Sequence, residues 1–333
     1  MAAEVSLLAG YDAAITAAPT LAAVLSAIRA DHAAHRAALD AELARRSPGR
    51  TAAPQPSSGT PAVRPPLAVP TPSPVAGPDA ATTVQDLTAT ETANAAARSD
   101  DAIVAAAGPL AAVLGSVAAS EAVHATVLAT VLATVPATVP ATGPGPGTPP
   151  ASVPATVPGA GHSAVTDVDV LQTLLATENA AAYGYGVLGG HLASAERTVA
   201  SQAEDAHLAR RDAVARLVRD RGVSPTPAAP GYVVPGPVAD RTAALTLASR
   251  LEDGAAAAYR YGLAATPNAD IRRLAVAALQ DAAVRAVRWR LLLAPTAPAT
   301  RPFPGEAFPG EPPSASPTPA SASLTSAPAP PRS

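Results

Sequence analysis

Four glutamates stand inside runs of the sequence whose apolar residues recur every three or four positions. Glu178, for example, follows Leu171 and Leu175 in such a pattern. A carboxylate on the apolar face of a helix is costly unless it has a partner, which can be a metal ion, a cation or a hydrogen-bond donor. The four acids in this setting are Glu4, Glu91, Glu178 and Glu252.

Other segments carry an acid and a histidine about one helical turn apart, so that both side chains share one helix face. These pairs, three or four residues apart, are Asp31/His35, Glu121/His124 and Glu204/His207. Asp281 stands in a fourth segment of this kind, with Val284 where the matching histidine would fall. The pattern therefore predicts a complete set of paired ligands in the N-terminal half and an incomplete one in the C-terminal half.

A glutamate from each of two helices plus a Glu-x-x-His pair from each of two others is the ligand set of dinuclear iron and manganese carboxylate bundles. Four carboxylates offset the charge of two divalent ions, and oxygen and nitrogen donors suit iron or manganese. The N-terminal candidate ligands are Glu4, Asp31, His35, Glu91, Glu121 and His124. The C-terminal candidates are Glu178, Glu204, His207, Glu252 and Asp281.

A metal-free interpretation of the same residues stays open. His32 competes with His35 as a ligand, and Arg98 falls on the inner stripe of its segment, where it could pair with an acid. In the C-terminal half a guanidinium could take the place of the metal charge and form a buried carboxylate–arginine network. The arginines on or beside the inner faces there are Arg210, Arg211, Arg285 and Arg288.

Tyrosines recur at a fixed distance from three of the buried acids. The pairs are Glu4/Tyr11, Glu178/Tyr185 and Glu252/Tyr259, each seven residues apart. Seven residues make two helical turns, so each tyrosine lies on the same face as its glutamate. The repetition indicates an internal repeat, and it predicts that a tyrosine hydroxyl donates a hydrogen bond to a carboxylate across the bundle.

Eight segments with a period of 3.6 residues would carry these side chains. They cover about 2–17, 20–46, 80–106, 109–133, 167–190, 193–221, 240–265 and 268–293. The short connections predict antiparallel hairpins, and a long crossover joins two hairpins in each half, as in ferritin-like four-helix bundles. The predicted fold is all-α, with a bundle at 1–134 that contains a disordered insert at 47–79, and a second bundle at 167–294. The Pro-rich linker 135–166 and the tail 295–333 are predicted to be disordered.

Composition excludes several classes of function. The net charge of −3, without a basic cluster, argues against a nucleic-acid partner. The absence of cysteine excludes iron–sulfur clusters and thiolate chemistry. The longest apolar run, near 125–135, is short and ends at Pro136, so no transmembrane span is expected. The N-terminus lacks the basic region of a signal peptide, which predicts a cytoplasmic protein as written, or an envelope protein if translation starts upstream.

The chain resembles the ferritin-like superfamily, and more specifically a bacterial two-part family catalogued as a domain of unknown function. The resemblance is carried by residues 169–305, from "DVLQTLLATENAAAYGYGVLGGHL" through "SRLEDGAAAAYRYGLAA" to "LQDAAVRAVRWR" and "RPFPG". The N-terminal stretches "YDAAITAAP", "IRADHAAHRAAL" and "ASEAVHATVL" resemble the upstream part of the same proteins. The resemblance implies a fold and, in many members, a secreted or lipid-anchored location, but no activity.

Two functions are therefore expected as alternatives. In the first, a dinuclear iron or manganese centre handles iron, oxygen or peroxide, with the carboxylates holding the ions. In the second, the fold is a metal-free binding or structural module with arginine–carboxylate cores. A ferritin-type cage is not expected, because two linked bundles with long insertions suit such a shell poorly.

Overall fold

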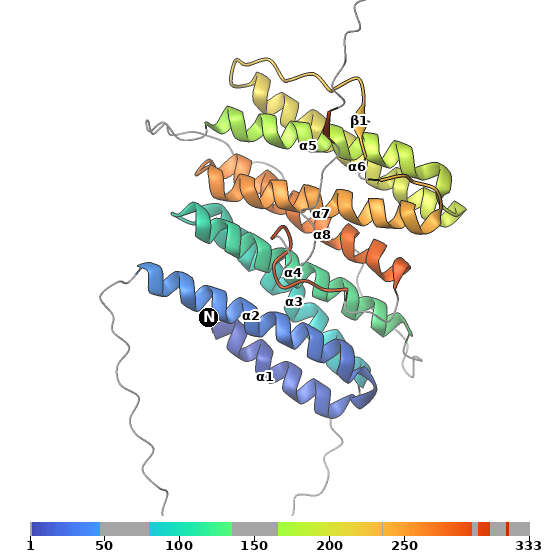
Figure 1. The fold of residues 1–333 in the computed structure, drawn as a ribbon. Coiled ribbons are helices and arrows are strands. Elements are labelled where there is room, and N and C mark those ends of the chain that lie inside the picture. Colours follow the sequence, from blue (N-terminus) through green and yellow to red (C-terminus); the bar gives the residue numbers. More distant parts are fainter. Residues whose placement is uncertain are drawn as a thin grey trace, which may run out of the picture. The chain divides into compact units, whose positions relative to one another are not determined.

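The computed structural model describes residues 2–46, 80–134, 166–234, 236–294, 299–306 and 318–319. Within these ranges the regular secondary structure is helical apart from one pair of two-residue strands (Figure 1). The elements are α1 (Ala2–Ala17), η1 (Pro19–Leu21), α2 (Ala22–Arg46), α3 (Ala80–Val104), α4 (Gly108–Thr134), α5 (Asp167–Leu188), η2 (Gly189–His191), α6 (Ser194–Arg219), β1 (Tyr232–Val233), α7 (Arg241–Ala265), α8 (Ala269–Leu293) and β2 (Thr318–Pro319). The prediction of an all-α protein is confirmed.

Capping side chains fix where three of these helices begin. The hydroxyl of Thr166 accepts the backbone N–H of Asp169, whose carboxylate accepts the backbone N–H of Thr166 in return, which forms a capping box at α5. Asp240 accepts the backbone N–H of Ala243 at 2.8 Å to start α7. Asn268 caps α8 in the same way. Caps of this kind stabilise a helix by about 1 kcal/mol each.

The predicted segments agree with the eight helices to within about two residues at most ends. The difference at the start of the second segment has a local cause. Thr20 lies inside the 3-10 turn Pro19–Leu21, and α2 begins only at Ala22. Pro19 is the first residue of this turn: its ring fixes φ at a helical value, and the turn needs no hydrogen bond from its nitrogen. The chain therefore enters α2 through η1.

Two compact units make up the chain. Unit 1 comprises Met1–Ala97, Ser120–Ser163 and Thr300–Pro302. Unit 2 comprises Arg98–Ala119, Ala164–Ala299 and Phe303–Ser333. Helices α3 and α4 therefore contribute residues to both units. The predicted division into four-helix bundles at 1–134 and 167–294 stays a prediction.

In unit 1, α1 and α2 form a hairpin (Figure 1), and both helices contribute buried apolar side chains. Leu25 and Ile28 of α2 and Tyr11 of α1 are fully buried. Val84 of α3 and Leu128 of α4 are buried to the same extent. Large side chains are few in this alanine-rich sequence, so the helices approach closely and polar groups between them are cut off from water.

Unit 2 contains two hairpins, α5–α6 and α7–α8, with α5 packed against α7. Its core includes Leu188, Leu245 and Trp289, each at most 1% exposed. Close packing between α5 and α7 is visible at Gly184, where an added Cβ would lie 2.7 Å from the side chain of Leu251. The small residues of these helices are therefore needed for their approach.

The structure differs in part from the disorder predicted for the tail 295–333. Residues 318–319 pair antiparallel with β1. Gly305 has φ of +82°, and a Cβ there would lie 2.6 Å from the carbonyl oxygen of Ala256, so the segment fits its place only with glycine. Such contacts are specific to single residues and leave no periodic signal in the sequence. The predicted disordered insert 47–79 lies outside the described residues, and so does the predicted linker 135–166 apart from Thr166, the N-cap of α5.

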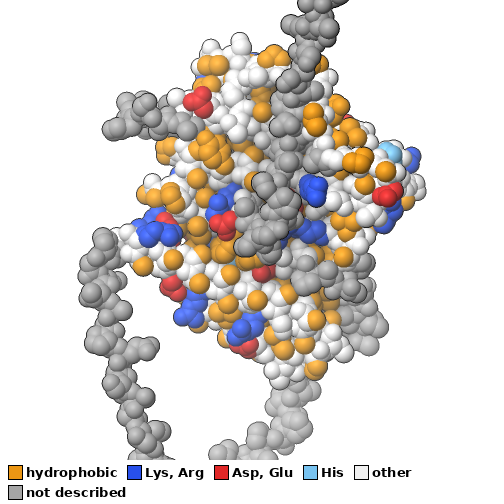
Figure 2. Space-filling model, in the orientation of Figure 1, with side chains coloured by type: hydrophobic (Ala, Val, Ile, Leu, Met, Phe, Trp, Pro, Cys, Tyr) orange, Lys and Arg blue, Asp and Glu red, His pale blue; other side chains and the backbone are white. Residues whose placement is uncertain are grey.

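One helix among the described residues has the length and composition of a membrane span. Gly108–Ala133 of α4 has a mean hydropathy of 1.4, and 72% of this window is buried within the structure. The bent pair Ala2–Ala17 and Pro19–Arg46 passes the same test if it is counted as one span. On the face drawn in Figure 2, basic and acidic side chains of the described residues are interspersed.

Candidate metal centre

Seven side chains of the types that ligate metals lie buried in unit 1, and they come from four helices. We call them the three-histidine cluster. Its members are Glu4 of α1, Asp31, His32 and His35 of α2, Glu91 of α3, and Glu121 and His124 of α4. Asp31 is 8% exposed and the other six are fully buried. Burial of so many ionisable groups is costly unless they neutralise one another or bind ions.

His32 lies between two carboxylates of this cluster. Its Nδ1 donates to Glu4 Oε2 at 3.0 Å, and its Nε2 donates to Glu91 Oε1 at 2.7 Å. Burial by itself lowers the pKa of His32, but the hydrogen bonds to Glu4 and Glu91 outweigh it and raise the pKa to about 9. Both ring nitrogens are therefore directed at carboxylates that come from different helices.

His35 and His124 each use Nε2 for a hydrogen bond that fixes the orientation of the ring. His35 Nε2 donates to the carbonyl oxygen of Pro302 at 2.7 Å, and His124 Nε2 donates to Asp31 Oδ2 at 3.1 Å. This leaves Nδ1 of both rings on the inner side of the cluster. His35 Nδ1 lies 3.8 Å from Glu4 Oε2, and His124 Nδ1 lies 3.5 Å from Glu91 Oε2. A ring nitrogen tied to a carbonyl or a carboxylate is typical of histidines that ligate metals.

The ligand atoms fall into two groups that share His32. Glu4, His32 and His35 each offer one atom within 4.8 Å of the others, and so do His32, Glu91 and His124. The ring of His32 lies 5.3 Å from that of His35 and 5.0 Å from that of His124. These residues could hold metal ions, because imidazole and carboxylate are ligands of zinc, iron, manganese, copper and nickel.

Charges inside the cluster keep Glu91 ionised. Burial raises the pKa of Glu91, but His124 and His32 outweigh this effect and hold the pKa well below its usual range. Tyr11 donates a hydrogen bond of 2.5 Å to Glu91 Oε1. Burial and the neighbouring Glu91 raise the pKa of Tyr11, so the hydroxyl keeps its proton. Burial and the charges of His124 and His32 lower the pKa of His35 to about 4, which leaves a neutral ring.

All six predicted N-terminal candidates lie in this one cluster. Two roles differ from the expected ones: His32, expected only as a competitor of His35, lies at the centre, and Asp31 bonds to His124. The spacing of three between His32 and His35 was the signal for the first of these, since it is the spacing of a ligand pair. Arg98 pairs with Asp101 at 3.1 Å.

Unit 2 has a second buried group, here called the arginine cluster: Glu178, His207, Arg210, Glu252 and Arg285. His207 Nδ1 donates to Glu178 Oε2 at 2.7 Å, and Nε2 lies 3.3 Å from Glu252 Oε1. Burial lowers the pKa of His207, but Glu252 and Glu178 outweigh it and raise the pKa to about 9. Arg285 Nε donates to Glu252 Oε1 at 2.7 Å, and Arg210 lies 3.6 Å from Glu178. The carboxylate–arginine contacts that the sequence predicted are present.

Aromatic hydroxyls complete the arginine cluster. Tyr259 donates to Glu178, and Tyr185 donates to Glu252 at 2.6 Å. The indole N–H of Trp289 donates to the Tyr185 hydroxyl at 2.9 Å. Together with Tyr11 and Glu91 in unit 1, all three predicted tyrosines bond to a carboxylate of another helix.

The other two C-terminal candidates lie outside the buried group. Glu204 is half-buried on α6. Asp281 is 60% exposed and pairs with Arg210 at 2.8 Å. Arg211 pairs with the adjacent Asp212, and Arg288 is exposed on α8. The structure therefore brings together Glu178, His207 and Glu252 of the five predicted residues.

The two clusters have the same register along the chain. His32 follows its partner Glu4 by 28 residues, and His207 follows Glu178 by 29. One turn further on, α2 has His35 where α6 has Arg210. His124 and Arg285 each follow the glutamate they contact by 33 residues. Unit 1 thus has three imidazoles where unit 2 has one imidazole and two guanidiniums.

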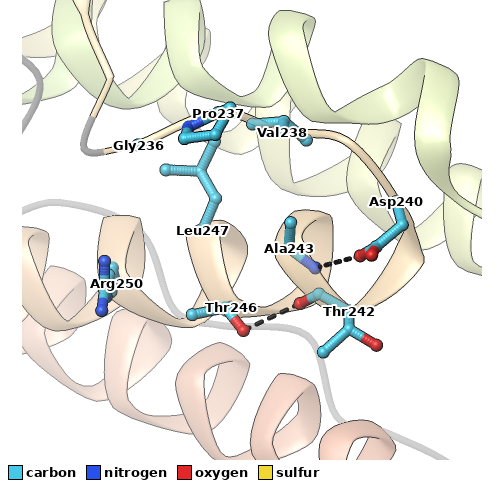
Figure 3. A pocket seen from close by; sticks show the side chains of 9 residues that line it. All are labelled: Gly236, Pro237, Val238, Asp240, Thr242, Ala243, Thr246, Leu247 and Arg250. Atoms are coloured by element: carbon cyan, nitrogen blue, oxygen red, sulfur yellow. Dashed lines mark hydrogen bonds between the residues drawn. The ribbon is translucent and has the colours of Figure 1, made fainter.

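A surface pocket of about 320 Å³ lies in unit 2, between the loop Gly236–Asp240 and the first turns of α7 (Figure 3). Its polar groups have local partners. Asp240 accepts the N–H of Ala243, and the hydroxyl of Thr246 donates to the carbonyl of Thr242 at 2.8 Å. These groups cap and pack α7. Among the residues that line the pocket, no set of ligand-type side chains converges on one point.

Fold and site define an all-helical protein with buried histidine–carboxylate clusters. Residues 170–312 match a family described as a domain of unknown function (DUF4439). A similar solved structure is that of a conserved hypothetical protein, rv2844, from Mycobacterium tuberculosis, with 35% identity over 38% of this chain and 96% of that chain and a TM-score of 0.37. A search of curated proteins finds no match. Residues 170–312 fit an uncharacterised family, and helices α1–α4 precede the matched range.

Proposed function

We propose that unit 1 holds a dinuclear non-haem metal centre, with iron or manganese as the ions, and that it handles iron, oxygen or peroxide. One observation carries this proposal: seven buried ligand-type side chains from four helices converge, and two groups of three ligand atoms lie within 4.8 Å of one another. Bound ions would supply Lewis-acid or redox chemistry. The protein's own part is to hold them with carboxylates and imidazoles away from water.

Atoms without hydrogen-bond partners support a fit to ions. Glu91 Oε2 and His124 Nδ1 are buried, and among the described residues their one polar contact is with each other, at an ion-pair distance longer than an ordinary hydrogen bond. A buried polar atom without a good hydrogen bond costs about 1–3 kcal/mol of stability, and a bound ion is one explanation for such an atom. Both atoms face each other at 3.5 Å inside one of the two ligand groups.

A ferritin-like arrangement is part of this proposal. In such bundles each of four helices sends a carboxylate inward, and two of them add a histidine. Unit 1 draws its ligands from α1, α2, α3 and α4 in this manner, and the repeated register of the two clusters is what an internal duplication of the bundle would produce. The repeated spacing of the cluster residues along the chain, more than any single residue, supports a ferritin-like arrangement.

For unit 2 the second function is favoured, namely a metal-free binding or structural module. Guanidiniums cannot ligate a metal, because they keep their proton and have no free lone pair. Arg210 and Arg285 contact the carboxylates Glu178 and Glu252, which would otherwise be the ligands. The ion pairs supply positive charge at the position where unit 1 has imidazoles.

Elemental analysis of the full chain, purified without chelator, tests both assignments. The informative variants are Glu121→Ala/His124→Ala in unit 1 and the matched Glu204→Ala/His207→Ala in unit 2. We expect near-stoichiometric iron or manganese that is lost only in the unit 1 variant. Absence of metal from the wild-type protein after anaerobic Fe(II) loading would refute the dinuclear centre, and loss in the unit 2 variant alone would reverse the assignment.

A further inference from the structure

The two groups of ligand atoms in unit 1 have one residue in common. His32 belongs both to the group with Glu4 and His35 and to the group with Glu91 and His124. It takes part in the two groups through different atoms, since Nδ1 faces Glu4 Oε2 and Nε2 faces Glu91 Oε1. An imidazole ring has only these two nitrogens, and both are directed into the cluster.

The other two histidines are oriented to serve one group each. The carbonyl of Pro302 and the carboxylate of Asp31 occupy the Nε2 atoms of His35 and His124. Each ring therefore has only Nδ1 for an ion, next to Glu4 and to Glu91 respectively. Asp31 and the backbone at Pro302 act as positioning groups that fix which nitrogen faces inward.

We infer that the two ions share the imidazole of His32 as a bridging ligand. Nδ1 would bind the ion held with Glu4 and His35, and Nε2 the ion held with Glu91 and His124. The protonated ring would lose both N–H protons to solvent and form two metal–nitrogen bonds, so the bridging species would be the imidazolate of His32. This inference rests on the dinuclear centre proposed above and states how its two halves are joined.

A bridging imidazole gives each ion two nitrogens and a carboxylate. Such a set accepts zinc, copper and cobalt as readily as iron, because imidazole suits all of these ions. A bridge through His32 also distinguishes this centre from one bridged by carboxylates alone, in which His32 would bind one ion or none. The role of His32 can therefore be measured by counting ions.

The experiment compares Co(II) and Zn(II) binding by the full-length wild-type protein with that by His32→Ala, His35→Ala and His124→Ala. We expect two ions per wild-type chain, one tight ion in each of the His35 and His124 variants, and at least about tenfold weaker binding of both ions in His32→Ala. His191→Ala is the matched control, because this exposed histidine lies outside both clusters. Circular dichroism establishes that each variant is folded.

A second measurement needs no variant. With one equivalent of Cu(II) the wild-type protein should give the electron paramagnetic resonance signal of an isolated ion, and with two equivalents that signal should give way to a coupled pair. Two independent signals, or a His32→Ala protein that keeps a tight ion, would overturn the bridge while leaving the metal centre standing. A wild-type protein that binds none of these ions would overturn both.

Discussion

Replacement of Arg285 by methionine tests whether the arginine cluster stabilises unit 2 through its charge. The guanidinium donates to Glu252 Oε1 at 2.7 Å, and Glu252 has no exposed surface. Removing one partner of a buried ion pair typically costs 3–5 kcal/mol, since the other charge stays buried. Tyr185 and His207 still bond to Glu252 in the variant, so we expect a loss of about 3 kcal/mol, at the lower end of this range.

Trp289 provides a local signal for this experiment. It is the only tryptophan, it is 1% exposed, and it bonds to the hydroxyl of Tyr185. Urea unfolding followed by its fluorescence therefore reports on unit 2. For a domain of this size a loss of about 3 kcal/mol corresponds to a decrease in Tm of roughly 6–12 °C.

Arg288→Met is the matched control, because Arg288 is exposed one turn further along α8. It should change the free energy of unfolding by less than about 0.5 kcal/mol. The double variant Glu252→Leu/Arg285→Met should recover much of the stability, since a buried pair replaced by apolar groups is often neutral. A loss below about 1 kcal/mol in Arg285→Met, or no recovery in the double variant, would refute the reasoning.

Three further predictions follow from the two clusters. Folding raises the pKa of His207 to about 9, so protonation of this ring stabilises the folded state by about 3 kcal/mol. This contribution is complete below pH 6.5 and is lost as the pH rises through 9. Unfolding followed by tryptophan fluorescence should show the loss in the wild-type protein and not in His207→Gln. Tyr11→Phe removes the hydrogen bond to Glu91 and should lower stability by about 2 kcal/mol in thermal unfolding followed by circular dichroism; an unchanged Tm would contradict it. Arg210→His/Arg285→His should add a binding site for Zn(II) in unit 2 to those expected in unit 1, so calorimetry should give a higher Zn(II) stoichiometry than for the wild-type protein; a folded variant that binds no more Zn(II) than the wild type would show that the imidazoles alone do not make the site.

Much of the fold could be predicted because its signals are local and periodic. Alanine and leucine at helical spacing set the eight helices, and Gly and Pro mark their ends. The seven-residue spacing between Glu178 and Tyr185 placed both on one face and predicted a hydrogen bond to a carboxylate across the bundle, which the structure identifies as Glu252. This inference needed only the helix period and the expectation that a buried hydroxyl has a partner.

The choice among Asp31, His32 and His35 could not be made in the same way. All three lie within about one turn of α2, and the rotation of that helix decides which of them faces the centre. Packing of Leu25 and Ile28 sets this rotation, and it turns His32 between Glu4 and Glu91. The acid–histidine pattern favoured Asp31 with His35, whereas Asp31 in fact orients His124.

Hydrogen bonds to backbone carbonyl groups could not be predicted from the sequence, for a different reason. The carbonyl oxygens of Arg301 and Pro302 bond to Ser120 and His35 in unit 1, at a separation of 181 and 267 residues. Every residue has a carbonyl group, so residue types cannot show which one orients a histidine. A segment expected to be part of a disordered tail thus supplies groups to the candidate site.

Charge supports the proposal that the two clusters have different functions. In unit 2, the buried carboxylates Glu178 and Glu252 meet Arg210, Arg285 and a protonated His207, and Arg210 also pairs with the exposed Asp281, so the carboxylates are compensated without any ion. In unit 1, four carboxylates meet three histidines, and His35 has a pKa of about 4 and carries no charge. The raised pKa values of His32 and His124 favour a charge on these two rings, which face Glu4, Glu91 and Asp31. The guanidiniums of unit 2 thus supply a fixed positive charge where unit 1 has imidazoles, which can ligate an ion, and this difference is why we propose a metal centre for unit 1 alone.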